Sequence, residues 1–149
     1  MKSLSPMPTQ PEVAATGEPL APLGVLKGAR VLVVEDEVIV AMDVQANLEA
    51  AGATVLGPAH TLSEALELAT NFTLSAAVLD LRIGRETIGP VARVLKARNI
   101  PFLFYTGQLA GDVLRSEWPE APVLSKPASA NEMAEAVAPL LQVRAIQGN

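Results

Sequence analysis

The sequence predicts an α/β domain built on a doubly wound, five-stranded parallel sheet with helices on both of its faces. Two observations support this prediction. Short apolar runs alternate along the chain with segments in which apolar residues recur at helical spacing. The first of these runs, from Val31 to Val34, is apolar throughout, as expected of a parallel strand that helices cover on both sides. Each strand then reaches its parallel neighbour through a helical crossover, which is right-handed in nearly all proteins.

The first two pairs of strand and helix fall in the first half of the folded chain. One strand is predicted from Arg30 to Val34, and a second from Thr54 to Gly57. The helix between them is indicated by apolar residues at helical spacing, namely Val40, Ala41, Val44, Leu48 and Ala51. The next helix is expected at about Ser63 to Ala69, where Thr61 and Glu64 have the spacing of a capping box.

The third and fourth pairs follow in the same order. A third strand ends at Asp80, and Pro90 suits the first turn of the helix after it, which Asn99 can close. The fourth strand is expected from Pro101 to Tyr105. The segment from Ala110 to Trp118, which leads to the last strand, is short and only weakly periodic.

The fifth pair completes the predicted domain. Its strand runs from Val123 to Ser125, and Ser129 with Glu132 opens a last helix. Pro139 lies inside this helix, where its ring would clash with the carbonyl four residues earlier. We therefore expect the helix to kink or to end early near Ala138.

Length and proline content set the domain boundaries. A chain of 149 residues fits one domain with a core of useful size. Of its 12 prolines, five lie in the first 26 residues, which show neither a helical nor a strand period. We expect a flexible tail at residues 1–26, a folded domain at residues 27–145 and a short tail at residues 146–149.

Charge and cysteine content exclude several classes of function. A net charge of -5 argues against a nucleic-acid surface, which needs clustered Lys and Arg. Cysteine is absent, so disulfides and thiolate metal sites are excluded. The chain has no stretch of about 18 apolar residues and no signal-peptide pattern. We expect a cytoplasmic protein that binds neither nucleic acid nor membrane.

Polar residues follow four of the predicted strands at the point where each strand ends. These are Glu35-Asp36-Glu37 after the first strand, Asp80 at the third, Thr106 at the fourth and Lys126-Pro127 at the fifth. The carboxyl ends of parallel strands form one edge, where open α/β sheets bind ligands. Acids, a hydroxyl and an ammonium gathered there indicate metal-assisted chemistry on a phosphoryl group.

The three consecutive acids are the candidate metal site. At about 4 Å each pair of like charges costs on the order of 4 kcal/mol at an effective dielectric of about 20, and a divalent cation would relieve this repulsion. Carboxylates with room for water and phosphate oxygens suit Mg²⁺ better than Zn²⁺. The alternative is a solvated turn in which Asp36 caps the next helix.

Asp80, Thr106 and Lys126 supply the other groups that phosphoryl chemistry needs. The Asp80 carboxylate can act as a nucleophile that forms an aspartyl phosphate, although Asp at a strand end is also a common turn residue. Thr106 can donate to a phosphoryl oxygen, and Lys126 can neutralise the phosphate as a point charge. The bond between Lys126 and Pro127 is a candidate for the cis form.

With these motifs in this order, residues 27–144 resemble a response-regulator receiver domain of two-component signalling, of the CheY-like type. The resemblance implies a flavodoxin-like sheet with the strand order 2-1-3-4-5. It also implies that Asp80 accepts a phosphoryl group from a sensor histidine kinase, and that Thr106 and Lys126 hold that group. Slow hydrolysis and a change in affinity for a partner protein would follow.

The same resemblance implies a set of ligands for Mg²⁺. Asp36 and Asp80 would bind the ion directly, and the backbone carbonyl of Arg82 would complete the ligands from the protein. Glu35 stands in the paired-acid position next to Asp36 and would act through water.

A narrower resemblance lies in the fourth strand. Residues 101–107, Pro-Phe-Leu-Phe-Tyr-Thr-Gly, are similar to the strand of the "FAT GUY" receivers, which are mostly stand-alone proteins paired with HWE-type or related histidine kinases. Tyr105 replaces the usual Ala, and Gln108 replaces the usual Tyr. The resemblance therefore points to a stand-alone receiver whose kinase is HWE-type or related.

Two positions depart from the usual receiver pattern. Val123 stands where receivers commonly carry a Tyr or Phe whose rotation reports phosphorylation. We therefore expect the signal to pass through the segment from Gly107 to Glu117, whose poor helical period suggests low local stability. Arg82 places a long cation next to the phosphorylation site and should alter the lifetime of the aspartyl phosphate.

Other functions stay open at this stage. A pseudo-receiver used only for docking or dimerisation would have the same fold. A haloacid-dehalogenase-type phosphatase also combines Asp, Thr, Lys and Mg²⁺, but its nucleophile lies on the first strand. We expect output through a downstream protein or action as a phosphate sink, and no enzyme activity beyond the chain's own phosphorylation and dephosphorylation.

Two further residues have structural alternatives. His60, the only histidine, is expected to have a surface or capping role rather than to relay protons. Trp118 is expected to pack against the neighbouring strand, with a contact to a partner as the alternative.

Overall fold

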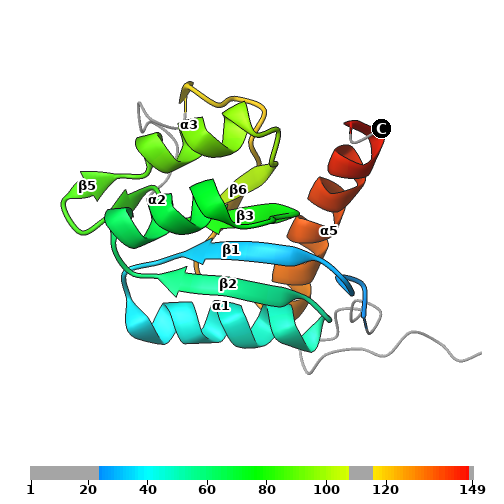
Figure 1. Cartoon of the computed structure of the whole chain (residues 1–149). Coiled ribbons are helices and arrows are strands. Elements are labelled where there is room, and N and C mark those ends of the chain that lie inside the picture. Colours follow the sequence, from blue (N-terminus) through cyan, green and yellow to red (C-terminus); the bar gives the residue numbers. More distant parts are fainter. Residues whose placement is uncertain (1–23, 108–115, 148–149) are drawn as a thin grey trace, which may run out of the picture.

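The computed structural model describes residues 24–107 and 116–147, and it contains a five-stranded parallel sheet with the order β2-β1-β3-β6-β7 (Figure 1). The strands are β1 (Arg30–Val34), β2 (Thr54–Ala59), β3 (Ala76–Leu79), β6 (Phe102–Thr106) and β7 (Val123–Ser125). The described helices are α1 (Val38–Ala50), α2 (Leu62–Asn71), α3 (Gly89–Ala97) and α5 (Ala130–Gln147). This arrangement confirms the predicted doubly wound fold and its strand order 2-1-3-4-5.

The two faces of the sheet carry separate hydrophobic layers because successive strand residues point to opposite sides. Leu32 and Phe104 lie in the layer that also contains residues of α2 and α3, such as Ala65 and Leu95. Val33, Leu103 and Tyr105 lie in the other layer, with residues of α1 and α5 such as Leu48 and Val137. In Figure 1 these helix pairs cover opposite sides of the sheet.

Both predicted helix starts with a capping motif are present, in different forms. At α5 the bonds are reciprocal: Ser129 N–H donates to Glu132 Oε1 at 2.8 Å, and Glu132 N–H donates to Ser129 Oγ at 3.1 Å. At α2, Glu64 N–H donates to Thr61 Oγ1 at 3.1 Å, but the Glu64 carboxylate accepts from His60 N–H instead of from the cap residue. The first is the full capping box and the second is half of one.

The prediction that the last helix ends early near Ala138 is wrong, because α5 continues through Pro139 to Gln147. Pro139 itself is exposed, whereas Met133, Val137 and Leu140 are buried against the sheet on both sides of it. Packing of this apolar face outweighs the one backbone hydrogen bond that proline removes. The alternative, a kink, stays a prediction.

A short hairpin was not predicted. β4 (Arg82–Ile83) pairs antiparallel with β5 (Glu86–Thr87) just after Asp80. Strands of two residues are too short to show a hydrophobic period, so the sequence indicated only a turn there. The hairpin projects from the carboxyl edge of the sheet (Figure 1).

Leu26 is fully buried and its N–H donates to Ala51 O at 2.8 Å, so packing starts just before the predicted boundary at Lys27.

Trp118 is buried with its ring 6.2 Å from that of Phe102 and 6.4 Å from that of Phe104, which confirms the packing role. Most of the segment from Gly107 to Glu117 lies outside the described residues. Among those described, no helix is both long and apolar enough to cross a membrane.

Candidate functional site

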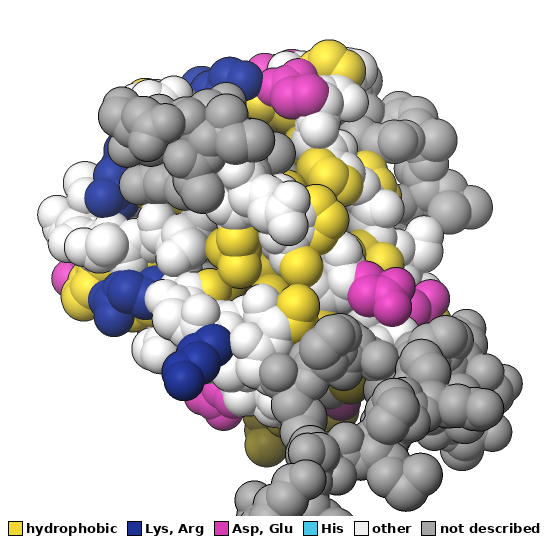
Figure 2. All heavy atoms as spheres, turned by 90° about the vertical axis from the view of Figure 1, so that its right-hand side faces the viewer, with side chains coloured by type: hydrophobic (Ala, Val, Ile, Leu, Met, Phe, Trp, Pro, Cys, Tyr) yellow, Lys and Arg dark blue, Asp and Glu magenta, His cyan; other side chains and the backbone are white. Residues whose placement is uncertain are grey.

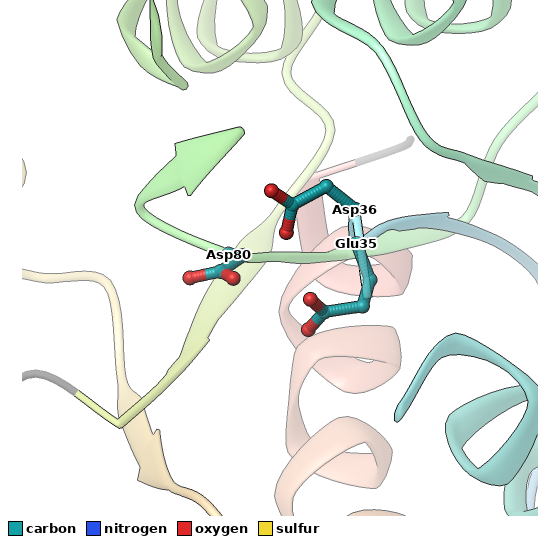
Figure 3. Close-up of side chains that lie close together, drawn as sticks. All are labelled: Glu35, Asp36 and Asp80. Carbon is teal, nitrogen blue, oxygen red and sulfur yellow. The ribbon is translucent and has the colours of Figure 1, made fainter. Parts of the chain in front are cut away.

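Three acids meet at the carboxyl edge of the sheet. Glu35 and Asp36 follow β1, and Asp80 follows the adjacent β3. One carboxylate oxygen from each lies within 4.8 Å of the other two, and Figure 3 shows the side chain of Asp36 extending toward Asp80. The parallel pairing of β1 with β3, in which Val34 lies opposite Leu79, brings the two strand ends together. The predicted convergence of Glu35 and Asp36 with Asp80 is therefore confirmed, whereas Glu37, the third acid of the turn, lies outside this cluster.

Glu35 is the most deeply placed of the three acids, with 2% of its surface exposed. Its N–H donates to Ala59 O at 2.9 Å, because β2 contains an extra residue where the pairing with β1 shifts register. Its Oε2 accepts from Glu37 N–H at 3.1 Å. Burial raises the pKa of Glu35 above its usual range, and the bonds from Lys126 and Glu37 oppose that rise.

Lys126 reaches the acids from the end of β7. Its Nζ lies 2.6 Å from Glu35 Oε1 and donates to Asp80 Oδ2 at 3.0 Å. Burial acts to lower the pKa of Lys126, but the bonds to Glu35 and Asp80 outweigh it and raise the pKa. Lys126 therefore stays charged and neutralises part of the acid cluster. The bond to Pro127 is cis, as the sequence suggested.

Asp36 faces the β4–β5 hairpin and does not cap α1. Its Oδ2 accepts from Gly84 N–H at 2.8 Å, and the residue at the N-cap of α1 is Glu37, without a side-chain capping bond. Gly84 has φ +62°, a left-handed conformation that favours glycine in this turn. The alternative of Asp36 as a helix cap is therefore wrong, since its carboxylate is turned toward the other acids.

Thr106 ends β6 and is buried, with 2% of its surface exposed. It lies opposite Ser125 in the pairing of β6 with β7, and its carbonyl accepts from Lys126 N–H at 3.0 Å. Arg82 begins β4 two residues after Asp80, and its side chain is exposed. Both residues therefore stand at the edge that carries the acids, and their roles toward phosphate and metal stay predictions.

Two contacts at the site have no signal in the sequence. The exposed His60 has its Nδ1 2.8 Å from the carbonyl oxygen of Glu35, so it bonds to the acidic turn. The Tyr105 hydroxyl accepts from Ala128 N–H at 3.0 Å, across 23 positions of the sequence. Neither hydrogen bond follows from residue spacing, because each joins segments that only the folded sheet brings together.

The amino ends and the carboxyl ends of the strands carry different kinds of side chains. Figure 2, which views the molecule from the amino ends of the strands, shows apolar side chains at the centre of that face. A cavity of about 390 Å³ lies there, lined by Pro101, Phe102, Pro122 and Leu140 among others. The cluster of acids with Lys126 occupies the opposite, carboxyl edge, which is where α/β sheets bind ligands.

The donor set fits a small, hard cation. Asp36 and Asp80 are half-buried and Glu35 is buried, so the three carboxylates cannot be fully screened by water. All of the side-chain ligand atoms are carboxylate oxygens, and the described residues offer neither thiolate nor imidazole in this cluster. Mg²⁺ takes few carboxylates and keeps water ligands, so the residues fit this ion.

Comparisons with known proteins find chains that share this fold. The solution structure of SdrG from Sphingomonas melonis Fr1 is 38% identical, with a TM-score of 0.67, and the match covers 76% of this chain and 96% of that one. A CheY-like response regulator receiver domain protein from Methanospirillum hungatei JF-1 shares the fold, with a TM-score of 0.72 at 21% identity over 80% of this chain and 98% of that chain.

A curated relative is also similar. The phyllosphere-induced regulator PhyR of Methylorubrum extorquens is 34% identical over 79 residues, which is 51% of this chain. The matched part covers only 30% of that longer protein. No protein-family model matches the chain.

Proposed function

Because the chain belongs to the CheY-like receiver domains of response regulators, we propose that it accepts a phosphoryl group from a histidine kinase on Asp80. The observation that carries this proposal is the position of Asp80, which follows buried β3 and lies among Glu35, Asp36 and Lys126. Lys126 holds one side of this carboxylate, and 13% of the Asp80 side chain remains exposed, which leaves access for a phosphoryl donor to the nucleophile.

The proposed reaction is a single transfer of a phosphoryl group. An oxygen of the Asp80 carboxylate attacks the phosphorus of a phosphohistidine. The new P–O bond forms as the P–N bond breaks, and the electron pair of that bond stays on the imidazole nitrogen. Later attack of water on the phosphorus releases inorganic phosphate and restores the carboxylate. The chain's only chemistry is therefore its own phosphorylation and dephosphorylation.

The surrounding residues have separate roles in this proposal. Lys126 moves part of its interaction from Glu35 to an oxygen of the phosphoryl group. The phosphorylated Asp80 carries more negative charge than the free carboxylate did, so it attracts the ammonium more strongly. Thr106 donates its hydroxyl hydrogen to a second phosphoryl oxygen. Both residues therefore stabilise the charge that collects on the transferred group.

The proposal includes a magnesium site. Asp36, Asp80 and the backbone carbonyl of Arg82 would hold Mg²⁺, with Glu35 acting through water. The ion would supply positive charge to the phosphoryl oxygens in the transition state. Without it, the hydrogen bond from Gly84 and the ammonium of Lys126 are the main partners of Asp36 and Asp80.

A surface for the kinase lies next to the site. At the start of α1, Val38, Ile39 and Met42 are exposed by 55%, 78% and 60%. Ile39 and Met42 line a groove of about 440 Å³ together with Lys126 and Pro127. An apolar patch beside a reactive carboxylate suits the side of a helix that carries the phosphohistidine.

The rest of the proposed function follows from this chemistry. The chain acts in the cytoplasm, and it either changes its affinity for a downstream protein when phosphorylated or drains phosphate from a kinase. An HWE-type or related kinase is the proposed donor, from the resemblance of residues 101–107 to the FAT GUY strand. No nucleic acid or membrane is expected among its partners.

The direct test is phosphorylation followed by intact mass. The chain is incubated with acetyl phosphate and Mg²⁺, and one phosphoryl group should be added. Asp80→Asn and excess EDTA should each abolish the addition. Failure of the wild-type chain to take up phosphate, from acetyl phosphate and from every candidate kinase, would leave the pseudo-receiver as the better account.

The kinase surface is tested separately. Ile39→Asp should slow transfer from the cognate kinase and leave phosphorylation by acetyl phosphate unchanged. Phe72→Asp is the matched control, because Phe72 is an apolar residue exposed by 39% just after α2. Equal effects of the two substitutions on the kinase reaction would remove the proposed docking role of α1.

A further inference from the structure

Tyr105 lies between the lysine of the site and the start of α5. Its side chain is 4% exposed, and the Nζ of Lys126 is 5.6 Å from the centre of its ring. That distance is within the range of a cation–π interaction. Its hydroxyl accepts from Ala128 N–H at 3.0 Å. One side chain therefore contacts both the ammonium of the site and the backbone that leads into α5.

The position of Tyr105 on β6 explains how it can do this. It precedes Thr106, so its side chain points to the opposite face of the sheet, into the layer of α1 and α5. There it also lines the groove of about 440 Å³ between α1 and the Lys126–Pro127 segment, together with Ile39 and Met42. Tyr105 therefore lines the groove that lies next to the acid cluster.

The hydroxyl has a function that packing alone does not require. A phenylalanine would fill the same space in the apolar layer. The N–H of Ala128 lies ahead of α5 in a buried residue, and a buried N–H without an acceptor costs about 1–3 kcal/mol. Tyr105 supplies that acceptor and so fixes the three residues 126–128 to β6.

We propose that Tyr105 couples the state of Lys126 to the position of Ala128 and to the groove beside α1. This inference rests on the proposed phosphorylation of Asp80. When Lys126 turns from Glu35 to a phosphoryl oxygen, its charge moves relative to the Tyr105 ring. The ring and its hydroxyl then adjust together, and the hydrogen bond carries the change to the first turn of α5. Val123, at the position where receivers commonly carry an aromatic residue, cannot make such a contact with its aliphatic side chain.

The first test uses the fact that Tyr105 is the only tyrosine of the chain. Wild-type protein labelled with 3-fluorotyrosine gives one ¹⁹F resonance, which is followed as Mg²⁺ and beryllofluoride, a phosphoryl mimic, are added. The inference predicts that this resonance moves in the same titration as the amide of Thr106. A ¹⁹F resonance that stays in place while Thr106 responds would overturn it.

The second test uses Tyr105→Phe, which removes the hydroxyl and keeps the ring. Amide resonances are compared with and without beryllofluoride, at Thr106 and Gly107 for the site and at Ala128 and Ile39 for the coupled surface. The site response should be kept, while the response at Ala128 and Ile39 falls by about threefold or more, a size that one coupling residue can carry.

The outcomes separate this inference from the proposed function. Equal responses at Ala128 and Ile39 in both proteins would overturn the role of the hydroxyl. If beryllofluoride moves no resonance at Thr106 or Gly107 in the wild type, the phosphorylation site itself is wrong. Loss of the unfolding transition in Tyr105→Phe would leave the ¹⁹F measurement on the wild type to decide.

Discussion

The Nζ of Lys126 lies 2.6 Å from Oε1 of Glu35, a carboxylate that is almost completely buried. Asp36 and Asp80 each place one carboxylate oxygen within 4.8 Å of an oxygen of Glu35. The ammonium is therefore the main compensation for buried negative charge when no metal is bound.

The first prediction concerns the stability that this ion pair provides. Lys126→Met should lower the free energy of unfolding by about 2 kcal/mol or more, because Glu35 is left buried without its cation. Urea unfolding without Mg²⁺ measures the effect, and added Mg²⁺ should restore part of the loss. Lys96→Met is the control: it breaks an ion pair with Glu120 whose side chains are 63% and 60% exposed, and should cost less than about 1 kcal/mol. Equal losses in the two variants would contradict the prediction.

The second prediction concerns metal affinity. Asp36→Asn should weaken Mg²⁺ binding by about tenfold or more, since it removes a charged ligand. Isothermal titration calorimetry gives the dissociation constant. The control is Glu37→Gln, whose side chain is 69% exposed and lies outside the cluster. A binding constant for Asp36→Asn equal to that of the wild type would exclude Asp36 as a ligand.

The third prediction concerns the strand that supports Glu35. Gly57 has φ +95°, and a Cβ added there would lie 2.6 Å from Ala59 N and 3.0 Å from Val33 O. Gly57→Ala should therefore cost about 1–3 kcal/mol more than Gly28→Ala, where φ is +83° but nothing lies within 4 Å. Chemical unfolding of both variants checks this. Similar stabilities would show that the backbone near Gly57 adjusts freely.

The fourth prediction concerns the lifetime of the phosphoryl group. The exposed Arg82 cation begins β4, two residues beyond Asp80, where it can pair with phosphoryl oxygens and hinder water. Arg82→Ala should shorten the lifetime by about threefold, which corresponds to less than about 1 kcal/mol in the barrier. The decay is followed by intact mass after the phosphate donor is removed, with Arg85→Ala as the exposed control. An unchanged decay rate in Arg82→Ala would refute the role of Arg82.

Much of the fold could be predicted because β1 and β3, near the middle of the sheet, carry continuous apolar runs. Runs such as Val31 to Val34 and Ala76 to Leu79 are buried on both faces, so the sequence marks them clearly. Their polar ends then follow from parallel pairing, which places Asp80 beside Glu35 and Asp36. The position of the site could be predicted because the carboxyl ends of parallel strands lie at one edge of the sheet, and these polar residues follow those ends.

The features that the sequence did not reveal depend on contacts between distant segments. The bond from Ala128 to Tyr105 and the bond from Gly84 to Asp36 join elements that only the folded sheet brings together. The predicted early end of the last helix at Pro139 was wrong because the rule against proline in helices considers only local backbone contacts. In the folded chain Val137 and Leu140 pack α5 against the sheet.

The most direct measurement for the central claim is the position of the acyl phosphate in the chain. After phosphorylation with Mg²⁺ present, borohydride reduces an aspartyl phosphate to homoserine, and peptide mapping locates the reduced residue. The account predicts homoserine at position 80 and an unchanged Asp36. A reduced residue at another acid, or at none in a chain that has gained a phosphoryl group, would contradict it.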